Sequence, residues 1–281
     1  LVTGLALLVF GAEGIIRGSV SLAKQLQVSL FAIGVVVVAA GTSLPELANC
    51  IRTVIINHPD IAVGAVVGSN IANVILIMGT TALLCPVLSV TSNQIKQSFF
   101  NILISLGFII FCWMSLEFNS FFGFVSLILL LIIMSYQIRV GQVNLSEVEE
   151  QKTYSLFLTI LFIVVGILLL ILGSRLFIQS AIVIAQKFQI PESVIGVSLV
   201  AFGTSVPELV VGILSAIRRR VDFALGNVLG SNIYNILGIL GISSFFGEFN
   251  IPDLIADYDM YVMIGTVIFL FLFMTFIKKL N

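Results

Sequence analysis

The chain has 281 residues, of which 59% are hydrophobic and only 10% are charged, and its formal net charge is −1. An ordinary soluble domain carries about 25% charged residues, and disordered chains and nucleic-acid binders depend on charge. The composition, with a mean hydropathy of +1.19, therefore excludes all three classes. It indicates a chain that lies almost entirely in a lipid bilayer and has no nucleic-acid partner.

Apolar runs separated by short polar breaks predict an all-α polytopic membrane protein with nine helices in this chain. In chain order the predicted helices cover residues 2–23, 28–56, 61–88, 98–116, 118–138, 154–186, 190–217, 222–247 and 259–277. Several exceed the roughly 20 residues that a bilayer requires, so we expect them to tilt, kink or break. The polar stretch at residues 141–153 is the predicted cytoplasmic linker, and it divides the chain near its middle.

The two halves on either side of this linker repeat each other. Residues 34–49 match residues 196–211, and residues 64–79 match residues 226–241, at one offset of 162 with 19 of 32 positions identical. The identities include Thr, Ser, Pro, Glu and Asn, so shared apolar composition does not explain them. We predict two repeats, at 1–140 and 154–281. Because the first holds five helices, an odd number, the second enters the membrane from the opposite side and the repeats are inverted.

The same offset places the counterpart of the helix at 118–138 at residues 280–300, beyond the last residue of the chain. We therefore expect ten helices in the fold, with the tenth absent here. Positive charge sets the orientation, because cytoplasmic loops carry an excess of Lys and Arg. With the N-terminus outside, Arg52 and Lys187 are the only basic residues in the predicted outside loops. The nine predicted inside residues are Lys24, Lys96, Arg139, Lys152, Arg218, Arg219, Arg220, Lys278 and Lys279.

Two acidic residues, Glu46 and Glu208, lie deep within predicted helices at equivalent positions of the two repeats. A carboxylate at membrane depth costs roughly 3 kcal/mol on insertion scales, so the pair predicts an ion or proton site. Proline precedes each Glu and removes a backbone donor inside a helix. We expect broken helices here, with the freed carbonyls of Gly41 and Gly203 facing a cavity as ligands.

Further oxygen donors accompany each Glu. Two hydroxyl residues lie three and four positions before it, and a second motif places Ser and Asn on one helix face, four residues apart. These candidates are Thr42, Thr204, Ser43, Ser205, Ser69, Ser231, Asn73 and Asn235. For Asn70 and Asn232, a ligand role and an interhelical hydrogen bond both stay open. With no Cys or His in the set, Ca²⁺ and Na⁺ are favoured over zinc or copper.

The motifs GTSLPEL at 41–47 with GSNIAN at 68–73, and GTSVPEL at 203–209 with GSNIYN at 230–235, resemble the two α-repeats of prokaryotic-type sodium/calcium exchangers. Those exchangers belong to the calcium/cation antiporter superfamily. The resemblance implies a central Ca²⁺ held by both glutamates, the carbonyls of Thr42 and Thr204, and the amides of Asn73 and Asn235. It implies Na⁺ sites from Ser43, Ser69 and the Ala39 carbonyl at one end, and from Ser205, Ser231 and the Ala201 carbonyl at the other. Proton-coupled relatives usually carry GNA in place of GTS, which favours sodium coupling.

We therefore expect a secondary transporter of a prokaryotic cell membrane that exchanges Na⁺ for Ca²⁺ by alternating access, without a cofactor or an obligate protein partner. The helices at 2–23 and 154–186 resemble the sliding pair of the family. An H⁺/Ca²⁺ antiporter on the same fold is the nearest alternative, because glutamates also bind protons. A channel is disfavoured because one chain holds a complete site, and an enzyme because no Ser–His pair is available. The role of Glu13, within the first helix, stays open.

Overall fold

The computed structural model describes residues 1–85, 90–114, 117–141, 153–189, 201–252 and 255–280. The described chain is mainly helical, and Phe118 and Phe249 form an isolated antiparallel β-bridge. Seven of its helices are long and apolar enough to cross a membrane, or eight if the bent pair Leu30–Thr42 and Leu44–Ile55 forms one span. The predicted all-α polytopic fold is therefore confirmed.

The first repeat contains the following helical segments, some of which follow one another without a gap. They are α1 (Val2–Leu26), α2 (Leu30–Ile33), the π-helical η1 (Gly34–Val38), α3 (Ala39–Thr42), α4 (Leu44–Ile55), α5 (Pro59–Ala72), the π-helical η2 (Asn73–Met78), α6 (Gly79–Leu84), α7 (Ser92–Trp113) and α8 (Ser120–Val140). The break between α3 and α4 bends the chain by 43°.

The second repeat follows the same order. Its described segments are α9 (Leu156–Lys187), α11 (Ala201–Thr204), α12 (Val206–Ile217), α13 (Val221–Ile233), the π-helical η5 (Tyr234–Ile239), α14 (Leu240–Ser243), the π-helical η6 (Ile255–Asp259) and α15 (Met260–Leu280). Residues 190–200 of the predicted helix at 190–217, and residues 142–152 of the predicted linker, lie outside the described residues.

The predicted helix breaks are confirmed, and both fall at serine. Ser43 separates α3 from α4, and Ser205 separates α11 from α12. In each second segment proline occupies the first turn, where its missing N–H has no helical partner to lose. Glu46 and Glu208 therefore also lie in first turns, at the N-terminal ends of α4 and α12.

Several predicted boundaries are wrong by half a turn or more, and two of them have a clear local cause. The helix predicted at 98–116 begins at Ser92, because Thr91 and Gln94 form a capping box at its N-terminus. The Thr-Ser-Asn-Gln sequence at 91–94 carries that signal. The helix predicted at 222–247 ends at Ser243, where backbone turns at Phe245 and Phe246 take over from the helical hydrogen bonds.

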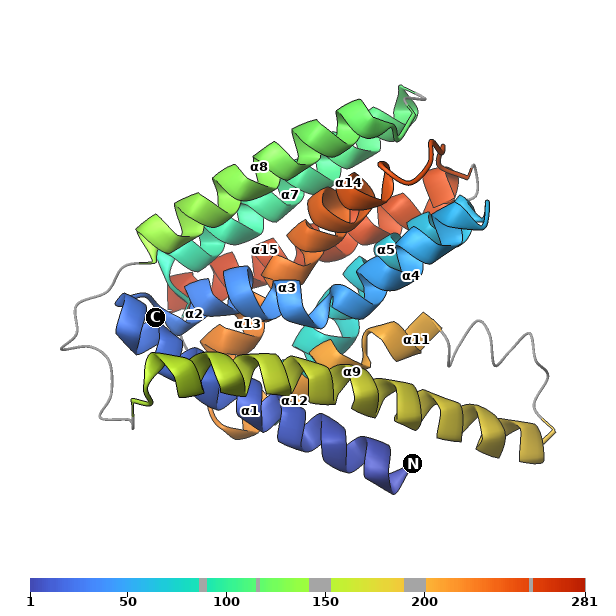
Figure 1. Ribbon diagram of the computed structural model, residues 1–281. Coiled ribbons are helices and arrows are strands. Elements are labelled where there is room, and N and C mark those ends of the chain that lie inside the picture. The colour runs from blue at the N-terminus through green and yellow to red at the C-terminus, as the bar shows by residue number, and fades with distance from the viewer. Residues whose placement is uncertain (86–89, 115–116, 142–152, 190–200, 253–254, 281) are drawn as a thin grey trace.

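Glycines hold α1 and α9 together as a close antiparallel pair, which crosses the lower part of Figure 1. A Cβ atom built on Gly11 would lie 2.8 Å from the Gly166 carbonyl oxygen, and one on Gly173 would lie 2.9 Å from the Gly4 carbonyl oxygen. Real Cβ atoms essentially never come so near, so these positions let two backbones touch. Small residues serve this purpose between membrane helices.

In Figure 1, α7 and α8 lie farthest from α1 and α9, and α2, α3 and α4 lie between them. The second broken helix lies nearer the pair, because α12 contacts α1. A large core of buried apolar side chains joins α5, α7, α8, α13 and α15. Residues 41–43 and 205–208, at the two breaks, are buried, which is the condition for irregular backbone at membrane depth.

Candidate functional site

The two glutamates are almost fully buried, with 1% of each residue exposed. Their carboxylates lie close enough to repel each other when both are ionised. The carboxylate of Glu208 also lies beside the hydroxyls of Thr42 and Ser43, which belong to the first repeat. Side chains from both repeats therefore lie close together here, and that they bind an ion stays a prediction.

Buried oxygen atoms around the glutamates have no hydrogen-bond partner among the described residues. They belong to both carboxylates, to two hydroxyls and to two amides. They are Glu46 Oε1 and Oε2, Glu208 Oε2, Ser43 Oγ, Ser231 Oγ, Asn73 Oδ1 and Asn235 Oδ1. A buried polar group without a partner costs about 1–3 kcal/mol. A hard cation that takes oxygen ligands would remove this cost.

Two of the predicted flanking serines contact each other across the repeats. Ser69 Oγ lies 3.2 Å from Ser205 Oγ, so this contact joins one serine from each repeat. The backbone arrangement is the reason, because α5 contacts α11 of the other repeat, and α3 likewise contacts α13. The grouping of Ser69 with Ser43 at one Na⁺ site stays a prediction.

The asparagines form a crossed pair of hydrogen bonds between the repeats. Asn73 Nδ2 donates to Asn232 Oδ1 at 2.9 Å, and Asn235 Nδ2 donates to Asn70 Oδ1 at 2.9 Å. All four side chains are buried. Asn73 starts η2 and Asn235 lies in η5. Such wide helical turns occur often at functional sites. Asn70 and Asn232 thus both take part in interhelical hydrogen bonds, one of the two roles left open.

The Gly41 and Gly203 carbonyls were expected to lack hydrogen-bond partners, and for Gly203 the structure differs. Ser174 Oγ on α9 donates a hydrogen bond to the Gly203 carbonyl at 2.8 Å, so this carbonyl has a partner and is not left as a freed ligand. The glycines at the breaks have a packing role instead. A Cβ on Gly41 would clash with Ile167, and one on Gly203 would clash with Ile178, both on α9. Ala39 lies in α3 and Ala201 begins α11, next to the two breaks.

Asn227 is a residue of this region that the sequence reasoning missed. It is fully buried on α13, and its Oδ1 atom lies 3.3 Å from the Thr42 hydroxyl. The offset of 162 relates Asn227 to Ala65, so the contact exists in one repeat only. The signal was available as the polar difference between GNVLG at 226–230 and GAVVG at 64–68.

Glu13, whose role stayed open, forms ion pairs away from the two glutamates. Its carboxylate lies 2.7 Å from Arg17 Nε on the same helix and 3.0 Å from an Arg218 Nη atom after α12. These three side chains line a separate cavity of about 250 Å³. Both arginine side chains are half exposed. Exposed ion pairs of this kind contribute little to the stability of the fold.

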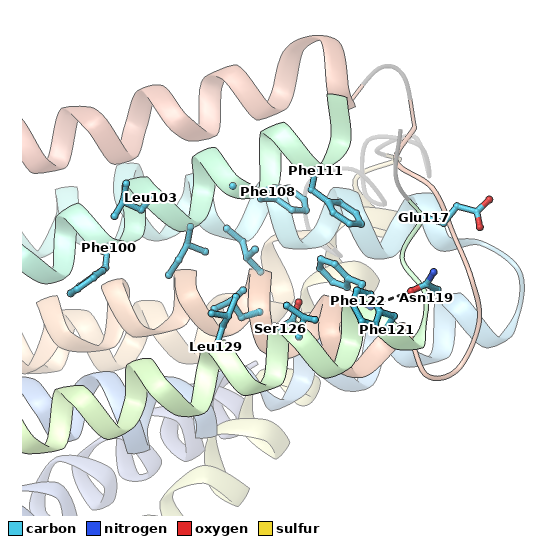
Figure 2. A pocket seen from close by; sticks show the side chains of 15 residues that line it. Phe100, Leu103, Phe108, Phe111, Glu117, Asn119, Phe121, Phe122, Ser126 and Leu129 are labelled. Carbon is cyan, nitrogen blue, oxygen red and sulfur yellow. Dashed lines mark hydrogen bonds between the residues drawn. The ribbon is translucent and has the colours of Figure 1, made fainter. Parts of the chain in front are cut away.

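A larger cavity of about 610 Å³ lies between α7 and α8 (Figure 2). Phe100, Phe108, Phe111 and Phe122 line it, and Glu117 and Asn119 lie at one end. None of its lining residues belongs to the predicted ion site. Its aromatic and aliphatic wall supplies too few oxygen atoms to hold a cation.

Two repeats that each break a helix and bring carboxylates, hydroxyls and amides to one buried place define a secondary transporter. A family model described as sodium/calcium exchanger protein matches residues 1–139 and 158–281. The chain therefore belongs to the sodium/calcium exchanger protein family. It is an integral membrane protein and a cation/Ca²⁺ antiporter, not an enzyme.

Individual relatives agree with this family. The chain is 35% identical over 270 residues to an uncharacterized membrane protein of Methanocaldococcus jannaschii, over 95% of this chain and 87% of that protein. It is 30% identical over 327 residues to the sodium/calcium exchanger MaX1 of Methanosarcina acetivorans, over 98% and 90%. The solved structure of the sodium-calcium exchanger NCX_Mj, soaked with Na⁺ and Sr²⁺, matches with a TM-score of 0.85 at 32% identity. That match covers 98% of this chain and 89% of that chain.

Proposed function

We propose that this chain exchanges Na⁺ for Ca²⁺ across the membrane by alternating access at the site around Glu46 and Glu208. The observation that carries the proposal is the set of buried oxygen atoms without partners, contributed by both repeats. Two carboxylates balance the charge of one Ca²⁺ or of two Na⁺ ions. Because both ions would use the same oxygens, binding of one excludes the other, which is the basis of exchange.

The proposed ligands are the side chains and carbonyls that the sequence singled out. They are Glu46, Glu208, Thr42, Thr204, Ser43, Ser205, Ser69, Ser231, Asn73, Asn235, Ala39 and Ala201. The buried carboxylates, hydroxyls and amides among them support a central Ca²⁺ position between flanking Na⁺ positions. The Ser69–Ser205 contact supports one flanking position with a serine from each repeat. The similarity to the sodium-calcium exchanger NCX_Mj favours sodium as the coupling ion.

We propose that α1 and α9 move together as one unit during exchange. The glycine contacts along their length make them a single close pair. The same pair packs against the broken helices through Ile167 and Ile178, which face Gly41 and Gly203. A shift of the pair would therefore change the surroundings of both breaks together.

The test uses purified protein in liposomes loaded with Na⁺ and diluted into buffer that contains ⁴⁵Ca²⁺. An outward Na⁺ gradient is expected to drive Ca²⁺ uptake, and dissipating the gradient with a sodium ionophore is expected to stop it. Uptake that ignores the Na⁺ gradient but follows a pH gradient in Na⁺-free buffer would refute sodium coupling and indicate H⁺/Ca²⁺ antiport. Single-channel currents would indicate a passive pore.

A further inference from the structure

The crossed asparagine contacts are the feature that the proposed exchange leaves unused. Asn73 and Asn235 occupy equivalent positions of the two repeats, and so do Asn70 and Asn232. Each bond runs from the later asparagine of one motif to the earlier asparagine of the other repeat's motif, at 2.9 Å in both cases. Each repeat therefore makes the same contact with the other repeat.

These contacts decide which end of an amide faces the cation. An asparagine side chain carries one oxygen and one NH₂ group on opposite sides of a planar amide. Asn73 and Asn235 direct their NH₂ groups to the partner asparagine, and their Oδ1 atoms are left without a partner among the described residues. An amide rotated by half a turn would present N–H donors to a cation and repel it.

The Oδ1 atom of each partner asparagine already accepts one hydrogen bond from the NH₂ group opposite. Asn70 is further held through its Nδ2 atom, which donates to the Asn232 backbone carbonyl at 3.4 Å and lies 3.7 Å from Met263 Sδ. The exposed fraction of both residues is at most 1%. Turning the Asn70 amide would break these bonds. Asn232 Nδ2 has no partner among the described residues, so the Asn232 amide is held by the bond that its oxygen accepts from Asn73.

We infer that Asn70 and Asn232 are positioning residues, each of which orients the asparagine ligand of the opposite repeat. The inference rests on the proposed Na⁺/Ca²⁺ exchange and adds the residues that prepare its amide oxygens. It also explains why the motif contains two asparagines three residues apart. The second supplies an oxygen to the cation, and the first fixes the second asparagine of the other copy.

A double-mutant cycle on the Michaelis constant for Ca²⁺ in Na⁺-driven uptake tests this inference. Asn73→Ala removes one ligand, and Asn232→Leu removes only the acceptor that orients it. Each single change is expected to raise the constant about tenfold, and the double variant also by about tenfold rather than 100-fold. Asn70→Leu with Asn73→Ala is the control on one helix, where the effects are independent and should multiply.

Asn232→Asp is the rescue variant, because it keeps an acceptor oxygen for Asn73 Nδ2 and is expected to bring the constant back toward that of the wild type. If Asn232 served only in packing, Asn232→Leu would lower thermal stability, and its effect on the Michaelis constant for Ca²⁺ would not be coupled to that of Asn73→Ala. Multiplicative effects in the Asn73–Asn232 cycle, or an unchanged constant in Asn232→Leu, would overturn the inference. If Asn232→Leu does not fold, Asn235→Ala with Asn70→Leu measures the equivalent coupling. Failure of wild-type uptake would instead reject the proposed exchange.

Discussion

Glu46 and Glu208 lie where the protein can tolerate a carboxylate before any cation arrives. Each is in the first turn of a helix that starts at membrane depth, and the positive end of the helix dipole favours a negative side chain there. Three of the four carboxylate oxygens have no hydrogen-bond partner among the described residues. The site is thus built to receive positive charge.

Removal of either carboxylate is expected to abolish Ca²⁺ transport. Glu46→Gln and Glu208→Gln keep the side-chain shape but halve the formal charge of the site, so apparent Ca²⁺ affinity should fall by at least about 100-fold. Na⁺-driven ⁴⁵Ca²⁺ uptake in liposomes, recorded over a range of Ca²⁺ concentrations, measures this apparent affinity. Glu117→Gln is the matched control, because Glu117 is exposed and lies outside the predicted ion site. Near-normal uptake by either buried variant would contradict the assignment.

At the residue scale, the sequence was sufficient to find the charged centre but not its pairing. Burial of Glu46 and Glu208 at repeat-equivalent positions follows from helix length and the cost of a charge in the membrane. The side to which Asn73 turns its amide depends on Asn232, which lies 159 residues away. Helical spacing describes one face of one helix and says nothing about which helix lies opposite.

At the scale of helices, the breaks at Ser43 and Ser205 were predictable because proline has a local effect on its own helix. The glycine spacing alone does not give the α1–α9 contact, although Gly4, Gly11 and Gly18 recur every seven residues. Such spacing marks a face that a neighbouring helix can approach closely, but many membrane helices could occupy that face. The family resemblance suggested the pair, and the fold shows that α9 is the neighbour in contact.

A methyl group within this contact is expected to destabilise the protein. In Gly11→Ala the new Cβ would lie 2.8 Å from the Gly166 carbonyl oxygen, and overpacking of this kind costs about 1–3 kcal/mol. The matched control is Gly107→Ala in α7, where no atom lies within 4 Å of the added Cβ. Thermal unfolding of the detergent-solubilised variants compares them. Equal unfolding temperatures for Gly11→Ala and Gly107→Ala would contradict this prediction and show that α1 and α9 can move apart without loss of stability.

At the scale of the molecule, the internal repeat carried most of the fold prediction, because an odd number of spans and a constant offset require inversion. The orientation in the membrane stays a prediction from the distribution of Lys and Arg. It places Glu117, before α8, outside and Arg139, at the end of α8, inside. Both side chains are exposed.

Cysteine labelling checks this orientation. In a background that lacks Cys50, Cys85 and Cys112, Glu117→Cys is expected to react with a membrane-impermeant maleimide on right-side-out vesicles. Arg139→Cys is expected to react only after the membrane is permeabilised, because a charged reagent does not cross the bilayer. The reverse pattern would place the N-terminus inside.

The crossed contacts have a consequence for the ancestry of the chain. When residue numbers of the second repeat are reduced by 162, Asn73–Asn232 and Asn235–Asn70 become one contact between positions 73 and 70. Gly11–Gly166 and Gly4–Gly173 likewise become one contact between positions 11 and 4. Such reciprocity is the mark of an isologous interface between identical subunits. Both the ligand geometry and the glycine contact are therefore ones that two copies of a half-length chain, inserted in opposite orientations, could form as a homodimer.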